Sequence, residues 1–288
     1  MRLLAVPNWS FGRDKRLLGK FREALEAQGV EIHFLESDVD HNRTVSAFSG
    51  DEHAIYESMV ALCDLAFDRI DLSKHVGVHP RIGALDVCPL VLLPHEIDPD
   101  ALEMALALAE RIAAAISSRY DLPVFLYEKS ERGRHEADLP SLRKGGFGGL
   151  IGRTINPDFG PHRAHPRLGV AVVGVRDFLI AFNVDLQTSD PSICRTIARR
   201  MRERRAEGDP RFLGVRALGF PLASRECTQI SVNVTLPDLT PIDPIIEWIM
   251  KRLATQKVPI LETELIGVIR NQDLPGATRL PHKKGQVI

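Results

Sequence analysis

The chain has 288 residues, of which 44% are hydrophobic and 26% charged, and this composition excludes a disordered protein because it supplies enough apolar side chains for a core. The 37 Lys and Arg residues nearly balance the 38 Asp and Glu residues, so the overall charge does not favour binding to nucleic acid or to an anionic membrane. A chain of this length predicts one large domain or two packed ones.

The N-terminal run RLLAV is broken at once by Pro7 and Asn8. It is too short for a signal sequence or a membrane span, so it predicts the first strand of a cytoplasmic protein. The four cysteines are widely spaced and include no CxxC pair: Cys63, Cys88, Cys194 and Cys227. This spacing predicts buried free thiols, and it supports neither a disulfide framework nor a metal site.

The first half alternates strands with amphipathic helices. Apolar patterns predict strands at 2–6, 31–37, 44–48, 87–93 and 123–128, and helices at 14–28, at 49–70 and at 100–120. Ser49 and Glu52 have the S-x-x-E spacing of a capping box, and Asp98 precedes a proline at a first helical position. These signals predict where two of the helices begin.

The second half gives a related order of elements. Strands are predicted at 169–175, 178–186, 211–220, 228–236 and 258–268, and helices at 190–206 and 241–256, the latter capped by Thr240 before a proline. The sequence therefore predicts an α/β (α+β) protein with two ferredoxin-like subdomains, 1–168 and 169–288. Each would have a mainly antiparallel or mixed sheet with helices on one face.

The loop 71–84 interrupts all periodicity and contains the run His79-Pro80-Arg81. Gly77 precedes this run and Gly83 follows it, directly before a buried strand. Glycines permit close backbone approach, and Arg81 offers a planar donor fork to a carboxylate, so the loop predicts a site around His79. The alternative is a structural histidine next to an ion pair between Arg81 and Asp86.

Two further polar clusters follow predicted strands, in the runs VPNWSFG and DVDHNRTV. Asn8 and Asn42 offer both donors and acceptors, Asp38 offers a carboxylate, and Arg43 offers a cation. In a βαββαβ sheet such strand ends can converge on one opening. The alternative for each of these residues is a turn or capping role.

The connection 129–166 is rich in Gly, Arg, His and Pro, and most of it has no apolar period. Between Lys129 and Arg167, eight Lys and Arg residues stand against four Asp and Glu residues. Such a segment is either a solvated linker or a site-forming loop, and its basic balance suits a ligand that bears carboxylates.

Nine motifs in order closely resemble the formiminotransferase family: VPNWSFG, DHNRTV, GVHPRIGALDVCP, LYE, LRKGGF, NPDFGP, FLIAFNVDL, TQISVNV and ELIGV. The resemblance extends from about Val6 to Val268. It implies a glutamate formimidoyltransferase of histidine degradation, which transfers a formimidoyl group between 5-formimidoyltetrahydrofolate and L-glutamate. It further implies tetrahydrofolate as co-substrate and a homodimer. The transfer chemistry needs no metal, and the chain length predicts a single-module form without a cyclodeaminase.

The resemblance also implies roles for individual residues. The family's catalytic histidine falls on His79, which would alternate as base and acid because imidazole titrates near neutral pH. The family's folate-contacting segment falls on Asp158, Phe159, Gly160 and Pro161, followed by His162 and Arg163. One departure concerns Phe11, which stands where the family has an acidic residue. Two alternatives stay open: an enzyme acting on 5-formyltetrahydrofolate and formylglutamate, and a folate-binding protein without catalysis.

Overall fold

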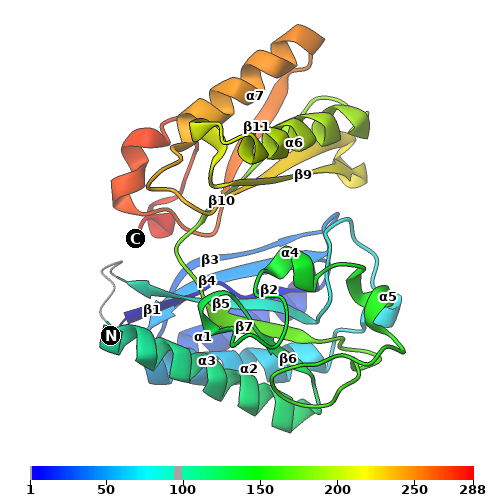
Figure 1. Cartoon of the computed structure of the whole chain (residues 1–288), viewed down its shortest axis with the longest axis vertical. Coiled ribbons are helices and arrows are strands. Elements are labelled where there is room, and N and C mark those ends of the chain that lie inside the picture. The colour runs from blue at the N-terminus through cyan, green and yellow to red at the C-terminus, as the bar shows by residue number, and fades with distance from the viewer. Residues whose placement is uncertain (1, 94–98) are drawn as a thin grey trace. The chain divides into compact units, whose positions relative to one another are not determined.

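The computed structural model describes residues 2–93 and 99–288, and the chain divides into two compact units, Met1–Asp177 and Phe178–Ile288 (Figure 1). The first unit contains β1 (Arg2–Ala5), β2 (Asn8–Trp9), α1 (Lys15–Ala27), β3 (Glu31–Asp38), β4 (Arg43–Gly50), α2 (Glu52–Phe67), β5 (Leu85–Leu93), α3 (Pro99–Tyr120), β6 (Val124–Leu126), α4 (Leu139–Leu142), α5 (Gly146–Leu150) and β7 (Ala171–Val175). The second contains β8 (Ile180–Leu186), α6 (Pro191–Ala206), β9 (Val215–Leu222), β10 (Cys227–Val234), α7 (Ile242–Gln256) and β11 (Ile260–Ile266). In the described residues, no helix is long and apolar enough to span a membrane.

The first sheet is mixed and has seven strands. Strands β1 and β2 both pair with β4 on one side and with β5 on the other, antiparallel in each case, and β3 pairs with the free edge of β4. With α1 and α2 as crossovers, this is the βαββαβ arrangement of a ferredoxin-like unit. The parallel strands β7 and β6 extend the sheet beyond β5. The predicted mixed α/β fold is confirmed.

Strand β7 belongs to the first sheet, whereas the sequence placed it at the start of the second half. It pairs in parallel with β5 and with β6, and the first unit therefore ends at Asp177 and not at residue 168. Val172 faces one apolar cluster while Ala171, Val173 and Val175 face another. A short run buried on both faces is typical of a central parallel strand, and its sequence alone does not identify its partners.

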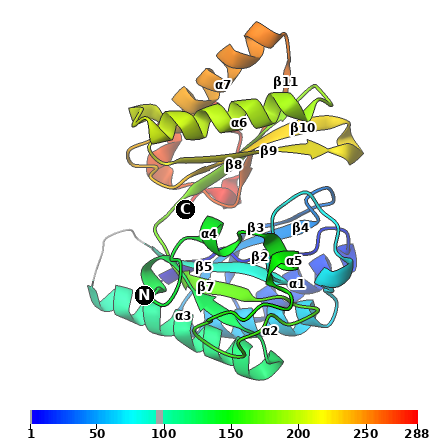
Figure 2. The same ribbon diagram turned by 45° about the vertical axis from the view of Figure 1, so that its right-hand side comes forward.

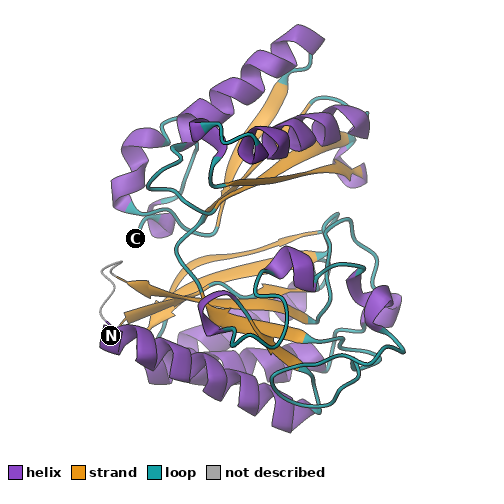
Figure 3. Ribbon diagram, in the orientation of Figure 1, coloured by secondary structure: helices purple, strands orange, loops and turns teal. Residues whose placement is uncertain are grey.

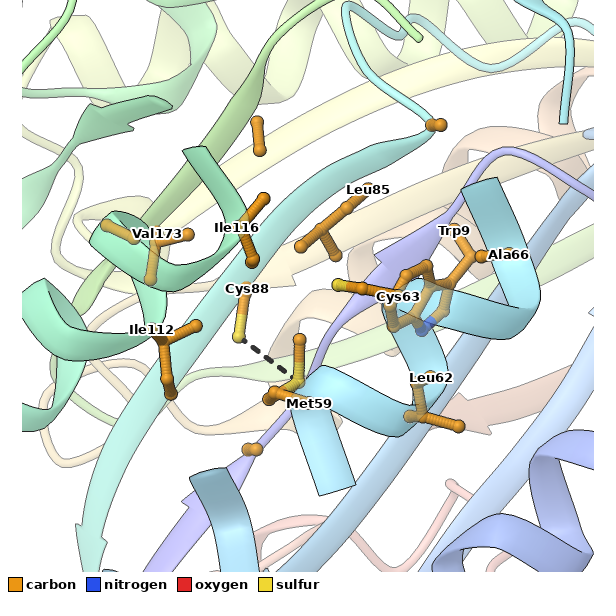
Figure 4. Packing of buried hydrophobic residues seen from close by; sticks show 14 of the residues in the cluster. Trp9, Met59, Leu62, Cys63, Ala66, Leu85, Cys88, Ile112, Ile116 and Val173 are labelled. Carbon is orange, nitrogen blue, oxygen red and sulfur yellow. Dashed lines mark hydrogen bonds between the residues drawn. The ribbon is translucent and has the colours of Figure 1, made fainter. Parts of the chain in front are cut away.

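Helices α1, α2 and α3 lie side by side on one face of the first sheet and bury the larger core (Figure 1). Figure 4 shows α2, α3 and β5 packed together there, with the Cys88 Sγ 3.6 Å from the Met59 Sδ. Cys63 lies in the same cluster, and burial raises the pKa of both thiols, that of Cys88 to about 12. All four cysteines are buried and free, as predicted.

The start of α2 corrects one expectation. Asp51 is the cap, because its carboxylate accepts a hydrogen bond of 2.8 Å from the Ala54 N–H. Ser49 instead lies in β4, where its hydroxyl contacts Arg2 and His33, so the proposed capping box is wrong. The cap expected at Asp98 lies outside the described residues.

The connection between β6 and β7 is mostly loop, with the short helices α4 and α5 within it (Figure 3). These helices cover part of the sheet face opposite α1, α2 and α3, where Leu142 and Leu150 pack with Val87, Phe125 and other residues in a second, smaller cluster. The connection is therefore folded onto the first unit.

The second unit is a four-stranded antiparallel sheet in the order β11-β8-β10-β9, with α6 and α7 on one face (Figure 2). This too is a βαββαβ unit, as predicted. Asp190 caps α6 through the Ser192 N–H at 2.8 Å. The Thr240 hydroxyl accepts from the Gly214 N–H at 3.1 Å and does not cap α7, so that expectation is wrong.

Candidate active site

Three loops at one end of the first sheet meet at Asn42. Its side-chain oxygen accepts a hydrogen bond of 2.8 Å from the Gly12 N–H, and its amide nitrogen donates to the Val76 carbonyl at 3.0 Å. Its own carbonyl accepts from His75 Nε2 at 2.9 Å. Asn42 has a φ of 46°, a left-handed conformation that asparagine tolerates better than most residues. Asn42 therefore has the turn role predicted for it, and it also links the three loops.

Glycine is required where these loops touch. A Cβ at Gly12 would lie 2.0 Å from the Asp38 carbonyl oxygen, and a Cβ at Gly77 would lie 2.4 Å from the His41 carbonyl oxygen. Between these contacts, the Asp38 carboxylate accepts hydrogen bonds from the N–H groups of Asp40 at 2.8 Å and His41 at 2.7 Å. Asp38 therefore shapes the turn that leads into Arg43.

His79 lies half-buried at the centre of this cluster. Its Nε2 is 2.7 Å from an Arg43 guanidinium nitrogen, and its Nδ1 is 2.8 Å from the Pro80 carbonyl oxygen. A guanidinium can only donate and a carbonyl can only accept, so Nε2 carries the lone pair and Nδ1 carries the proton. The two contacts hold one neutral tautomer, with the His41 ring edge-on at 5.7 Å between centroids.

The surroundings of His79 oppose its protonation. Burial lowers the pKa of His79 well below 6.5, and the positive charges of Arg43 and Arg143 and the nearby His41 lower it further. Burial and Arg143 also lower the pKa of Arg43, to about 10, which leaves that guanidinium charged at neutral pH. The cluster thus presents a neutral imidazole beside cations, an arrangement suited to an anionic ligand.

Arg81 holds the loop together from within. Its guanidinium donates to His75 Nδ1 at 2.5 Å, to the Gly77 carbonyl at 2.5 Å and to the His79 carbonyl at 2.7 Å. His75 must therefore be neutral with its proton on Nε2, and burial together with Arg81 lowers the pKa of His75 to about 4. His75 was not among the predicted residues, although it is a second histidine in the same aperiodic loop.

Asp86 pairs with Arg143 and not with Arg81, so the alternative ion pair considered from the sequence is wrong. The carboxylate of Asp86 also accepts from the Ile82 N–H at 2.8 Å. Arg143 follows α4, and the Phe147 N–H nearby donates to the Arg81 carbonyl at 2.9 Å. The connection thus packs on the loop of His79 through the LRKGGF motif, and Arg143 of that motif was not among the predicted site residues.

Asn8 and Phe11 lie on different sides of the sheet. Asn8 is paired directly with Val45, so its side chain lies on the face of Arg43, two residues along β4, and its amide donates to the Val6 carbonyl at 3.0 Å. Phe11 belongs to the larger core on the opposite face and stacks edge-on against Phe21 at 5.0 Å. The residue that departs from the family pattern is therefore a core residue in this chain.

The segment that begins at Asp158 anchors the connection. The Asp158 carboxylate accepts from the Leu126 N–H at 2.7 Å and contacts His135 Nε2 at 2.7 Å. Phe159 packs against the larger core, and Gly160, with a φ of 87°, would place a Cβ 2.4 Å from the Ser117 hydroxyl. These contacts give the three residues a structural role.

The following residues are more exposed. Pro161 is half-buried, whereas His162 and Arg163 are exposed. The His162 Nδ1 lies 3.0 Å from the Ile155 carbonyl oxygen. His162 and Arg163 are therefore the residues of the predicted folate segment whose polar side chains are exposed to solvent. Across the described residues, no group of three or more His, Cys, Asp or Glu side chains has an arrangement that could hold a metal ion.

The chain is similar in sequence to several formimidoyltransferases. A glutamate formimidoyltransferase from Streptococcus pyogenes serotype M1 is 32% identical over 268 residues, covering 91% of this chain and 87% of the relative. One from Thermoplasma acidophilum is 33% identical over 276 residues, covering 93% and 88%. A formimidoyltransferase-cyclodeaminase from Gallus gallus is 29% identical, and this chain spans only 52% of it.

Family models agree with the division of the chain. The N-terminal subdomain of the formiminotransferase domain matches residues 2–176, which is almost the whole first unit. The formiminotransferase domain model matches residues 181–286, which is almost the whole second unit. The cluster around His79 lies within the first match. With both units matched, the chain belongs to the formiminotransferase family.

Proposed function

We propose that this protein is a glutamate formimidoyltransferase, which transfers a formimidoyl group between the N5 nitrogen of tetrahydrofolate and the amino group of L-glutamate, as in histidine degradation. The two relatives with matching length carry that name. The observation in the chain that carries the proposal is the neutral His79, held in one tautomer by Arg43 and the Pro80 carbonyl. A fixed, neutral imidazole is the form that accepts a proton.

The chemistry needs one group that both accepts and returns a proton. The glutamate ammonium loses a proton before its amine attacks the formimidoyl carbon, and a tetrahedral centre forms. When the bond from that carbon to N5 breaks, N5 gains a proton. His79 would take the first proton at Nε2 and supply the second, a role that contributes about 100 to 10,000-fold to rate. The other loops would mainly position the reactants.

The substrate contacts follow from the sheet face. Arg43 and Asn8 lie on the same face of the sheet, so we assign Arg43 to the amino-acid substrate and Asn8 to the pterin of the folate. Asp38, Asn42 and Arg81 would act by shaping the loops, because their polar atoms already bond to the backbone. His162 and Arg163 are exposed and would meet the carboxylates of the folate tail, while Asp158 to Pro161 hold the segment in place.

The test is a transfer assay on two variants. His79→Ala should lose about 100 to 10,000-fold in turnover while retaining tetrahydrofolate binding, because an acid/base group contributes little to ground-state affinity. His53→Ala, at an exposed position on α2, is the matched control. Formimidoylglutamate and formylglutamate are offered separately as donors, with the first expected to react. Near-normal turnover of His79→Ala would exclude His79 as the proton carrier.

We further propose a cytoplasmic homodimer. The four buried free thiols suit a reducing compartment, because secreted proteins tend to pair their cysteines. The dimer is carried over from the family resemblance, and sedimentation analysis of the purified chain would decide it.

A further inference from the structure

The lone pair that His79 needs as a base is already occupied. Arg43 donates to Nε2 at 2.7 Å, and the Pro80 carbonyl holds the proton on Nδ1 at 2.8 Å. Nε2 can take up a proton only after the Arg43 guanidinium has moved away. A protonated Nε2 and a guanidinium are both donors, so they cannot hydrogen-bond to each other. In this state the base is blocked by its own neighbour.

Other groups near the ring reinforce the block. The positive charge of Arg143 and the nearby His41 ring both oppose protonation of His79. Arg143 is held by its ion pair with Asp86. Arg43 also feels the negative charges of Asp86 and Asp38, but its direct partner is the neutral imidazole of His79. A carboxylate is a much stronger acceptor for a guanidinium than a neutral ring, because charge-assisted bonds are about twice as strong as neutral ones. Of the two arginines, Arg43 is therefore the one that an incoming carboxylate can draw away.

We propose that Arg43 is a carboxylate receptor that controls His79: a substrate carboxylate takes the guanidinium, frees Nε2, and so permits deprotonation of the substrate amine. The inference rests on the proposed function and gives it a specificity rule. The ammonium N–H bond breaks, the proton moves to Nε2, and the amine keeps the electron pair with which it attacks the formimidoyl carbon. An amine without a carboxylate would leave the base blocked.

The carboxylate could come from the amino acid or from the glutamyl tail of folate, and the structure favours the amino acid because Arg43 is bonded to the proton carrier itself. Three probes distinguish these sources. Glutarate has the carboxylates of glutamate without its amine, p-aminobenzoylglutamate mimics the folate tail, and glutaramide is the uncharged control. None of these can undergo transfer, so the experiment is independent of turnover.

The measurement is the NMR titration of the His79 ring, assigned with His79→Gln. We expect glutarate to raise the titration midpoint by about one pH unit or more, since neutralising a neighbouring charge shifts a pKa by this order. Glutaramide should leave it unchanged. In Arg43→Gln, the midpoint of His79 should be higher without ligand and should no longer respond to glutarate. In Arg43→Lys, part of the response to glutarate should remain. Arg22→Gln removes a charge from α1, whose packed face lies on the other side of the sheet, and should behave like the parent.

The outcomes separate the two proposals. A midpoint that does not move when glutarate is present at saturating or at the highest soluble concentration would overturn the receptor role, as would an equal response in Arg43→Gln. A response to p-aminobenzoylglutamate alone would overturn the assignment to the amino acid. If glutarate shifts the midpoint but the chain shows no formimidoyl transfer, the receptor role stands and the proposed function fails.

Discussion

The ion pair between Asp86 and Arg143 should be the strongest single link between the site loop and the connection. The Asp86 side chain is 3% exposed and that of Arg143 is 17% exposed. The second carboxylate oxygen of Asp86 accepts from the Ile82 N–H, just after the His79-Pro80-Arg81 run. Asp86→Leu removes both contacts at once, and it leaves one largely buried cation and one buried N–H without the Asp86 carboxylate.

The expected magnitude follows from those two losses. Breaking a buried ion pair from one side costs about 3 to 5 kcal/mol, and an unsatisfied buried N–H costs about 1 to 3 kcal/mol. These effects overlap, so we expect Asp86→Leu to destabilise the first unit by about 3 to 5 kcal/mol. Asp86→Asn retains an acceptor for Ile82 and should cost less. Asp86→Leu combined with Arg143→Met should be far less damaging than the sum of the single changes, because no buried charge is then left alone.

The chain offers a probe for each unit, since it has two tryptophans, Trp9 in the first and Trp248 in the second. In a Trp248→Phe background, urea unfolding followed by fluorescence reports on Trp9, which is fully buried beside Phe21. The loss expected for Asp86→Leu corresponds to a midpoint lower by about 1 M urea or more. Equal midpoints for parent and Asp86→Leu, or strictly additive effects in the double variant, would refute the reasoning.

Three further predictions use the same probe or the transfer assay. Phe11→Glu should destabilise the first unit by about 3 to 5 kcal/mol, because it places a charge in the core against Phe21; a stable variant with altered glutamate affinity would instead place position 11 in the substrate site. Burial and Arg81 lower the pKa of His75 from its ordinary value of 6.5 to about 4. As the pH falls between these two values, the unfolded chain binds a proton at His75 that the folded chain does not bind, so the stability of the folded chain should fall. His75→Gln should flatten that decline in urea midpoints, and an unchanged slope would contradict the assignment. Prolonged treatment with a chelator should leave transfer activity unchanged, and activity that returned only on addition of zinc would show that a metal takes part.

The sequence predicted the elements well where the deciding signal is local. Alternation identified β3, the turn-like run DVDHNR before TVSAF identified β4, and a helical stripe identified α2, because each of these signals is local to one segment. The loop of His79 was also recognised locally, since glycines and prolines interrupt every period there. The cap of α2 was misplaced by two residues because Ser49 and Asp51 are both good capping residues, and only the position of the last β4 residue decides between them.

Contacts between distant segments could not be predicted in this way. Asp86 and Arg143 are 57 residues apart, and neither belongs to a pattern that specifies the other. The same limit applies to β7, because β7 and its partners β5 and β6 come from three separate parts of the chain. The sequence suggested Arg81 as the residue that binds a carboxylate. It could not show that the Arg81 guanidinium donates to carbonyls of its own loop, while the Arg43 guanidinium contacts the ring of His79.

The two units show why a shared topology does not locate the chemistry. Both are βαββαβ sheets, so the second helix and the fourth strand of each must be connected at the same place. In the second unit α7 and β11 are joined by residues 257–259, with Lys257 in a left-handed conformation at a φ of 56°. In the first unit the equivalent connection between α2 and β5 is residues 68–84, long enough to carry His75, His79 and Arg81 over the sheet end. Because the two units share the βαββαβ order and differ in this connection, the residue proposed as the proton carrier lies in a long loop that the second unit lacks, and the shared topology alone would not locate it.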